Sequence, residues 1–335
     1  MSEPALKAPY LLFLGDARDQ LAAKTASGVA NWRPEWCLGQ IRLEGCKADL
    51  GLDDLSIAEA AERGARTLVI GVANQGGFMP MTWTATMVQA LECGLDIASG
   101  LHTRLGDIAE VGAAAQRLGR RLFDVRHPSR SFKTGTGARR AGQRLLTVGT
   151  DCSCGKMYTS LALERELQAC GVSAAFRATG QTGIFIAGRG VSVDAVVSDF
   201  ISGATEWLSP AGQPDAWDLI EGQGSLFHPA YAGVSLGLLH GAQPDALVLC
   251  HEPTRTHMRG LADYPIPELD ACMKANLAAA HLTNPNARFV GISMNTSALD
   301  GEAAGRVLAA TGAATGLPCV DPMAGGVGPI VDNLL

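Results

Sequence analysis

A glycine-rich segment near the middle of the chain has the residue types of a phosphate-binding loop. It reads LTVGTDCSCGKM from Leu146 to Met157, an apolar run followed by glycine, small polar residues and lysine. A strand that turns into a helix through such residues aims several backbone N–H groups at one point, and the helix N-terminus there favours anions. Lys156 adds a full positive charge. The segment therefore predicts a site for a ligand that carries phosphates.

The loop departs from the common phosphate-loop pattern in two ways. Five residues separate Gly149 from Gly155, and Met157 follows the lysine where that pattern has serine or threonine. The missing hydroxyl normally binds magnesium, and a thioether is a poor ligand for a hard cation. Three nearby hydroxyls could substitute for it, on Thr150, Ser153 and Thr159. We expect no metal, and a turn with a surface lysine is the plain structural alternative.

The elements around this loop predict a parallel sheet with covering helices. After residue 142, short apolar runs alternate with amphipathic segments, as in βαβ units. The runs end at residues 149, 179, 222, 252, 295 and 322, and helical patterns cover 155–169, 193–208, 229–241, 265–281 and 300–315. The loop lies where the first of these runs meets the first helix. The sequence therefore predicts a P-loop-like domain over residues 141–335.

A first α/β series precedes it. Apolar runs at 10–15, 66–73, 95–99 and 122–126 are bounded by glycine, aspartate or asparagine, which is typical of buried parallel strands. Residues 1–140 therefore predict a Rossmann-like domain. The segment ANQGGFMP at 73–80 follows a strand and is a possible ligand loop.

The overall composition narrows the class of partner. The chain has 335 residues, a net charge of −6 and no long apolar run that could span a membrane. This balance argues against nucleic-acid and membrane partners and favours a small-molecule substrate. The N-terminus lacks the layout of a secretion signal, and nine cysteines show no paired spacing, so we expect free thiols and a cytoplasmic location.

Basic residues gather at one place. Nine lysines and arginines fall between Arg117 and Arg144 with a single acid, Asp124. The run fits a solvated surface between domains, and a rim that faces a polyanion is the alternative.

The loop and three longer motifs resemble a known family. The GTD...GK spacing is similar to that of dethiobiotin synthetase and its P-loop relatives. The stretches VGTDCSCGKM, RATGQTGIFIAGRGVSVDAVVSDFISGATEWL and EGQGSLFHPAYAGVSLGLLHG, behind a Rossmann-like domain, resemble the two-domain D-glutamate N-acetyltransferase family. The likeness covers essentially the whole chain. It implies transfer of an acetyl group from acetyl-CoA to an acidic amino acid in D-amino-acid catabolism, and relatives of this kind suggest a homodimer.

If the ligand is acetyl-CoA, its diphosphate should lie on the loop. The expected cofactor-binding residues are Gly149, Thr150, Asp151, Cys152, Ser153, Cys154, Gly155, Lys156 and Met157. A diphosphate that is only bound needs no magnesium, because acetyl transfer forms and breaks no bond to phosphorus. Arg139 and Arg140 from the basic run are candidates for the ribose phosphate.

Acetyl transfer to an amine needs a group that removes a proton from the ammonium. Asp194 is the expected base and Glu221 the group that orients the ammonium, although capping of a helix explains Asp194 equally well. Lys156, or the amides of Gly222 and Gly224, would stabilise the oxyanion. We expect the substrate itself to contact Arg177, Gln181, Thr182, Arg255 and His228, with arginine engaging its carboxylates.

Two other functions and one other mechanism of acetyl transfer stay open. In dethiobiotin synthetase relatives the acids that match Asp194 and Glu221 bind magnesium, which would make this chain a MgATP-dependent ligase or kinase. A nucleotide sensor without chemistry is the second. The other mechanism is a ping-pong transfer through a thiol acyl-enzyme on Cys152 or Cys154, because a thiol at a helix N-terminus can have a lowered pKa.

Overall fold

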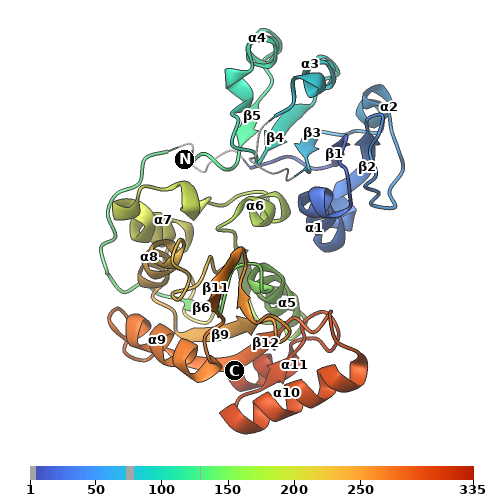
Figure 1. Cartoon of the computed structure of the whole chain (residues 1–335). Coiled ribbons are helices and arrows are strands. Elements are labelled where there is room, and N and C mark those ends of the chain that lie inside the picture. The colour runs from blue at the N-terminus through green and yellow to red at the C-terminus, as the bar shows by residue number, and fades with distance from the viewer. Residues whose placement is uncertain (1–4, 73–78, 129) are drawn as a thin grey trace. The chain divides into compact units, whose positions relative to one another are not determined.

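The computed structural model describes residues 5–72, 79–128 and 130–335. The chain divides into two compact units (Figure 1). The first contains residues 1–129 and 180–195, and the second contains 130–179 and 196–335. Each is built on its own parallel sheet with helices, which agrees with the predicted α/β class. The sequence predicts a boundary after residue 140 between two continuous domains, whereas in the structure the first unit also contains the later segment 180–195.

The first unit has a five-stranded sheet with the order β2-β1-β3-β4-β5, in which all neighbours are parallel. The strands are β1 (Tyr10–Gly15), β2 (Cys37–Arg42), β3 (Thr67–Ile70), β4 (Asp96–Ser99) and β5 (Leu122–Asp124). The sequence predicted all of them except β2. This edge strand is only partly buried and reads CLGQIR, so it lacks the continuous apolar run of its neighbours.

Helices cover the two faces of this sheet. They are α1 (Lys24–Trp32), α2 (Ile57–Glu62), α3 (Thr84–Glu92), α4 (Ala109–Leu118) and α6 (Gln181–Ala187). Because side chains alternate along a strand, Leu11 and Phe13 of β1 pack into one core with α2, α3 and α4. Tyr10 faces the other side, where its hydroxyl donates to the Phe185 carbonyl of α6 at 3.4 Å.

Helix α6 completes the second face of the first sheet, although it comes from far along the chain. Among the described residues 125–142, no helix follows β5 to return over the sheet. The segment 180–195 supplies that cover. The Leu6 amide donates to the Gly188 carbonyl at 2.9 Å, and the hydroxyls of Thr182 and Thr25 lie 3.4 Å apart.

The second unit has a six-stranded parallel sheet with the order β13-β12-β9-β6-β8-β7. Its strands are β6 (Gln143–Gly149), β7 (Ala174–Arg177), β8 (Trp217–Ile220), β9 (Ala246–His251), β12 (Arg288–Met294) and β13 (Cys319–Val320). All six follow the predicted runs. Strand β6 lies at the centre, and the chain crosses from one side of it to the other between β8 and β9. Open sheets bind ligands at such points, beyond the carboxyl ends of the strands.

Both faces of this sheet are covered. The helices are α5 (Lys156–Ala169), α7 (Ile201–Leu208), α8 (Ala232–Ala242), α9 (Leu269–His281), α10 (Gly301–Thr315) and α11 (Gly328–Leu334). Leu146 and Val148 of β6 face a core with α8, α9 and α10, and Leu145 faces a core with α5 and α11. Strand β6 is therefore fixed from both sides, and with it the loop that follows.

A short antiparallel hairpin, β10 (His257–Met258) and β11 (Leu261–Pro265), follows β9. Among the described residues, no helix is long and apolar enough to cross a membrane. Residues 73–78 of the possible ligand loop at 73–80 lie outside the described residues.

Candidate active site

The predicted loop joins β6 to α5. Strand β6 ends at Gly149 and α5 begins at Lys156, with Ser153 at φ 53° and Gly155 at φ 100°. Only glycine adopts the latter angle without strain. A side chain on Gly149 would lie 2.7 Å from the Cys154 sulfur and 3.0 Å from the Lys156 ammonium. Both glycines are therefore required for the loop to fold back over its own lysine.

The Lys156 ammonium is buried beneath this loop. The residue is 6% exposed, and Nζ donates to the Asp151 carbonyl at 2.7 Å and to the Cys154 sulfur at 3.6 Å. Its stem passes Gly222, where a β-carbon would lie 2.9 Å from Lys156 Cδ. In the described part of the chain no carboxylate lies within 4.0 Å of Nζ. A buried cation without a counter-charge is costly, so the arrangement favours an anionic ligand.

Several amide N–H groups of the loop are free to bind an anion. Within residues 130–335, no hydrogen-bond acceptor is found for the amides of Ser153, Cys154 and Gly155. They lie at the N-terminus of the 14-residue helix α5, where the helix dipole is positive. The Cys152 amide differs, because it donates to the Asp151 carboxylate at 2.7 Å.

Asp151 anchors the loop to the segment after β9. Its carboxylate accepts from Arg255 at 2.6 Å and from the Arg259 amide at 2.8 Å. Burial raises the pKa of Asp151, but the hydrogen bonds from Arg259, Arg255 and Cys152 outweigh it and leave the pKa below the ordinary value. The carboxylate is therefore ionised and fully occupied.

Arg255 is used by the loop itself. Its Nη1 also donates to the Cys152 carbonyl at 2.7 Å, while Nη2 donates to the Ser153 carbonyl at 3.3 Å and to the Glu252 carboxylate. We expected this guanidinium to bind a substrate carboxylate. Because both terminal nitrogens are engaged within the protein, its role is to hold the outer side of the loop. The sequence did not indicate Glu252 as its partner, although the spacing of three residues is a weak signal.

The hydroxyls that could replace the missing magnesium ligand are mostly engaged. The Thr150 hydroxyl lies 3.0 Å from His251 Nδ1, and the Thr159 hydroxyl donates to the Gly155 carbonyl at 3.0 Å and contacts Ser293 at 2.8 Å. These partners leave few oxygens to complete a hard-cation site. The absence of a metal stays a prediction.

One group of possible ligands for a softer metal lies at the loop. A carboxylate oxygen of Asp151, the sulfur of Cys152 and a ring nitrogen of His228 all lie within 4.8 Å of one another. The residues present do not fit a metal, because the Asp151 oxygens already accept three hydrogen bonds from the protein. His228 Nδ1 accepts from the Ala230 amide at 3.2 Å, so in the neutral ring the other nitrogen carries the proton.

The loop thiols do not favour an acyl-enzyme. Burial, followed by the charge of Asp151, raises the pKa of the Cys152 thiol. Cys154 is buried and donates to the Asp151 carbonyl at 3.1 Å. Since the thiolate is the nucleophile, neither environment activates the sulfur.

Glu221 lies at the carboxyl end of β8, beside the loop strand. It is 5% exposed, its Oε2 accepts from the Thr179 amide at 2.9 Å, and its carbonyl accepts from the Thr179 hydroxyl at 2.6 Å. The neighbouring Gly222 amide donates to the Thr147 hydroxyl at 3.0 Å, so it is not free for an oxyanion. Glu221 thus joins the ends of β7 and β8.

The predicted arginines of the second unit lie elsewhere. Arg177 pairs with Asp218 at 2.8 Å and lines a cavity with residues 141–144, at the amino end of β6. Arg139 pairs with Asp245 at 2.8 Å, before β9, and Arg140 donates to carbonyls that include Ser209 at 2.8 Å. β6 spans seven residues, so this edge is about 20 Å from the loop. The structure does not bring these three side chains to the loop.

The remaining predicted residues belong to the first unit. Asp194 lies in a 3-10 turn at Val193–Ala195 and pairs with Arg126 at 3.0 Å. Gln181 and Thr182 begin α6, where the Gln181 side chain packs against Gly100 and Thr182 contacts Thr25. Asp194 therefore has a cationic partner within its own unit.

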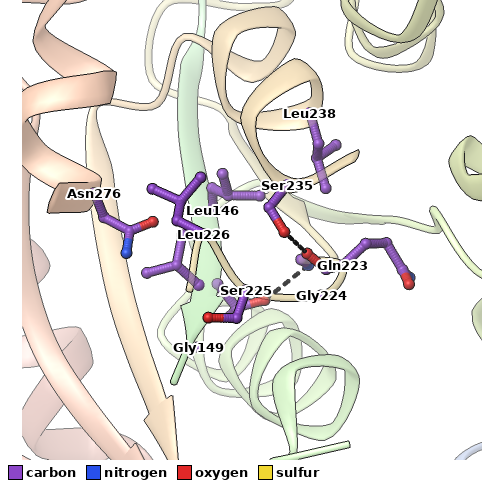
Figure 2. Close-up of a pocket in the computed structure, with 12 residues that line it drawn as sticks. Leu146, Gly149, Gln223, Gly224, Ser225, Leu226, Ser235, Leu238 and Asn276 are labelled. Carbon is purple, nitrogen blue, oxygen red and sulfur yellow. Dashed lines mark hydrogen bonds between the residues drawn. The ribbon is translucent and has the colours of Figure 1, made fainter. Parts of the chain in front are cut away.

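A narrow cavity lies beneath the loop strand (Figure 2). It is lined by Leu146–Gly149, Gly222–Leu226, Ser235, Leu238 and Asn276. Figure 2 shows Ser235 pointing toward Gln223, whose carbonyl accepts its hydroxyl at 2.7 Å. The cavity measures about 10 Å³, which is room for a single water molecule. It is too small for an amino acid.

Comparison with known proteins places the chain in a family. The family description "Domain of unknown function (DUF1611_C) P-loop domain" matches residues 131–331, and the DUF1611_N Rossmann-like domain matches residues 41–128. The chain belongs to the DUF1611 family. A crystal structure of a DUF1611 family protein from Anabaena variabilis is similar, with a TM-score of 0.85 and 33% identity, over 98% of this chain and 99% of that one.

Two curated relatives in this family carry a functional name. A D-glutamate N-acetyltransferase from Tritonibacter scottomollicae is 54% identical, and one from Pseudoalteromonas is 52% identical. Each match spans 98% of this chain and 99% of the relative. The predicted P-loop and Rossmann-like domains, and the resemblance to this family, are confirmed.

Proposed function

We propose that this protein transfers an acetyl group from acetyl-CoA to the amino group of D-glutamate. The near full-length identity of 54% and 52% to proteins named for that activity supports the reaction. The choice of acetyl-CoA as the donor rests on the buried Lys156 ammonium. Among the described residues it has no carboxylate partner, and it lies beside three loop amides for which no acceptor is found there. A diphosphate supplies the charge that this site lacks.

In this proposal the loop binds the diphosphate of acetyl-CoA, and the reaction occurs at the thioester, at the other end of the donor. The pantetheine arm of coenzyme A separates the diphosphate from the thioester, so a group that holds phosphate cannot also contact the acetyl carbon. Lys156, which we expected to serve both ends, is therefore assigned to the diphosphate. Arg255 and Asp151 keep the loop in shape.

The amine attacks the thioester carbonyl, the carbon–sulfur bond breaks, and coenzyme A leaves as the thiolate. One proton passes from the ammonium to a base before attack, and a second passes to the thiolate as the amide forms. Asp194 and Glu221 remain the proposed base and orienting group. Glu221 is buried and hydrogen-bonded, which suits a positioned group, whereas Asp194 is more exposed and paired with Arg126.

The test is direct. The protein is incubated with acetyl-CoA and a panel of D- and L-amino acids, thiol release is followed, and the product is identified by mass. We expect N-acetyl-D-glutamate and stoichiometric coenzyme A. ADP formation from MgATP without thiol release would identify a ligase or kinase, and tight nucleotide binding without turnover of any amine would identify a sensor.

Two matched substitutions separate the roles of the acids. Asp194→Asn should lower kcat by about 10²- to 10⁴-fold if Asp194 is the base. Glu221→Gln keeps an oxygen for the Thr179 amide and should chiefly raise the KM for D-glutamate. Equal small effects of both substitutions would contradict this assignment.

We also propose that the protein forms a homodimer and is located in the cytoplasm. Light scattering of the purified protein tests the homodimer.

A further inference from the structure

His228 is a buried histidine beside the loop with one ring nitrogen unpaired. The residue is 3% exposed, and its Nε2 has no hydrogen-bond partner in the part of the chain that the structure describes. A ring nitrogen lies within 4.8 Å of both the Asp151 carboxylate and the Cys152 sulfur. Buried polar atoms are nearly always paired, so this nitrogen needs a partner from outside the chain.

The surroundings of the ring determine what that partner must be. The Ala230 amide donates to Nδ1 at 3.2 Å, and Tyr231 stacks on the ring with a centroid distance of 4.4 Å and an interplanar angle of 28°. A nitrogen that accepts a hydrogen bond carries no proton, so the neutral ring carries its proton on Nε2. Nε2 is therefore a donor with a fixed direction. It cannot ligate a metal or take a proton from Cys152 in this state.

The His228 ring lies at the loop, where an anion is expected. Lys156 provides one positive charge, and Met157 replaces the hydroxyl through which related loops hold magnesium. A diphosphate has more acceptor oxygens than Lys156 and the amides of Ser153, Cys154 and Gly155 can satisfy. Asp151 is no competitor for the ring, because its carboxylate is paired with Arg255.

We infer that His228 is part of the diphosphate site and that its neutral imidazole donates Nε2–H to a phosphate oxygen of the bound donor. This inference rests on the proposed function for the identity of the donor, acetyl-CoA. It assigns to a neutral side chain part of the stabilisation that magnesium provides in related loops. The residue is thus a ligand of the phosphates and does not act on the acetyl group.

The experiment compares three substitutions by calorimetric titration with coenzyme A and with inorganic pyrophosphate. His228→Phe keeps the stacking on Tyr231 and removes the donor, so both probes should bind about 10- to 100-fold more weakly. His228→Gln carries an N–H group at a similar reach and should recover most of the affinity. His240→Phe is the matched control, because His240 is half-buried and its Nε2 also has no partner among the described residues, but it precedes Gly241, whose carbonyl accepts from Arg140 at the far edge.

A second measurement separates phosphate binding from chemistry. S-acetylpantetheine carries the thioester without the diphosphate, so His228→Phe should lower kcat/KM for acetyl-CoA and leave that for S-acetylpantetheine unchanged. Equal losses with both donors, or unchanged affinity for coenzyme A and pyrophosphate, would overturn the inference. If His228→Phe does not fold, the affinities of His228→Gln and His228→Asn for coenzyme A are compared instead. Only the glutamine amide reaches the Nε2 position, so the inference requires that His228→Gln binds more tightly.

Failure of the proposed function has a different signature. If the wild-type protein transfers no acetyl group but binds pyrophosphate, and His228→Phe weakens that binding, the role of His228 stands for another phosphate-bearing ligand. If the wild type acetylates D-glutamate but His228→Phe leaves donor binding intact, the function stands and the role of His228 is wrong.

Discussion

The two edges of the second sheet both contain buried cationic side chains, but they use them differently. At the amino edge, Arg144 is 1% exposed and its guanidinium donates to the Ser209 hydroxyl and to four backbone carbonyls. At the carboxyl edge, the Lys156 ammonium has two acceptors among the described residues, a carbonyl and a thiol sulfur. The Arg144 guanidinium is therefore satisfied by the protein, whereas the hydrogen bonds of the Lys156 ammonium leave room for an anion. Burial of a positive charge therefore indicates a binding site only where its hydrogen bonds are incomplete.

The largest expected effect is a loss of stability from a substitution at the amino edge. Arg144→Met removes the buried guanidinium that donates to the Ser209 hydroxyl and to the carbonyls of residues 140–142 and 210, so the free energy of unfolding should fall by about 3–5 kcal/mol. Urea denaturation measures it. Arg139→Gln is the control at the same edge, since its side chain is 55% exposed and its ion pair should contribute less than about 1 kcal/mol. Similar losses in the two variants would remove the distinction between the edges.

The matching change at the carboxyl edge should affect binding and spare stability. Lys156→Met removes the buried charge, so coenzyme A should bind about 10- to 100-fold more weakly. The urea midpoint should stay the same or rise, because the folded protein no longer buries an ammonium without a counter-charge. Calorimetry and urea denaturation of one preparation check both. A large loss of stability would mean that Lys156 is structural, as Arg144 is.

Arg255→Met tests the carboxyl edge from outside the loop, because Arg255 follows β9 and its guanidinium holds the loop by hydrogen bonds. Without its bonds to Asp151 and to the Cys152 and Ser153 carbonyls, the loop should open more often. Hydrogen exchange at the Cys152 amide, which donates to the Asp151 carboxylate, should accelerate, and coenzyme A should bind about 3- to 10-fold more weakly. Unchanged exchange would show that the loop is held by Asp151 and the Arg259 amide alone.

The smallest effect is a pH dependence at the carboxyl edge. Burial lowers the pKa of His251, whose Nδ1 contacts Thr150, below its usual 6.5. The unfolded ring takes up a proton below about pH 6.5 while the folded ring stays neutral, so stability should be constant above that pH and fall below it. The measurement is the urea midpoint between pH 8 and 5.5, which should fall with pH below about 6.5. Asp151, with its lowered pKa, does not titrate in this range. His251→Gln should flatten the profile, and an unaltered slope would assign it to other groups.

The sequence predicted the strands and the loop because their signals are local. Continuous apolar runs such as 143–149 fit a sheet covered on both faces, and glycine at 149 and 155 is required by contacts within the loop itself. The roles of the arginines could not be predicted in this way. Whether Arg139, Arg140 or Arg255 meets a ligand or a carbonyl depends on turns that are distant in the sequence, and a long side chain reaches either. His228 was indicated only by its position after a strand.

The local sequence of helix α6 also does not indicate which of the two units it packs against. Its sequence, QTGIFIA, is apolar enough for either unit, and its partners Leu6, Tyr10 and Thr25 lie more than 150 positions earlier in the chain. The positions 181 and 182 were read as part of the P-loop half because they follow the next strand after it. Long-range packing against β1 decides their place.

The return of residues 180–195 to the first unit has a consequence for biosynthesis. A ribosome that has extruded only residues 1–129 has exposed every strand of the first sheet but not α6, which completes the cover of one of its faces beside α1. Domains usually fold in the order in which they emerge, but here the leading one must wait for about 65 further residues. A gene fragment that stops at residue 129 should therefore yield aggregated product, and supplying 180–195 as a tethered peptide should rescue its solubility.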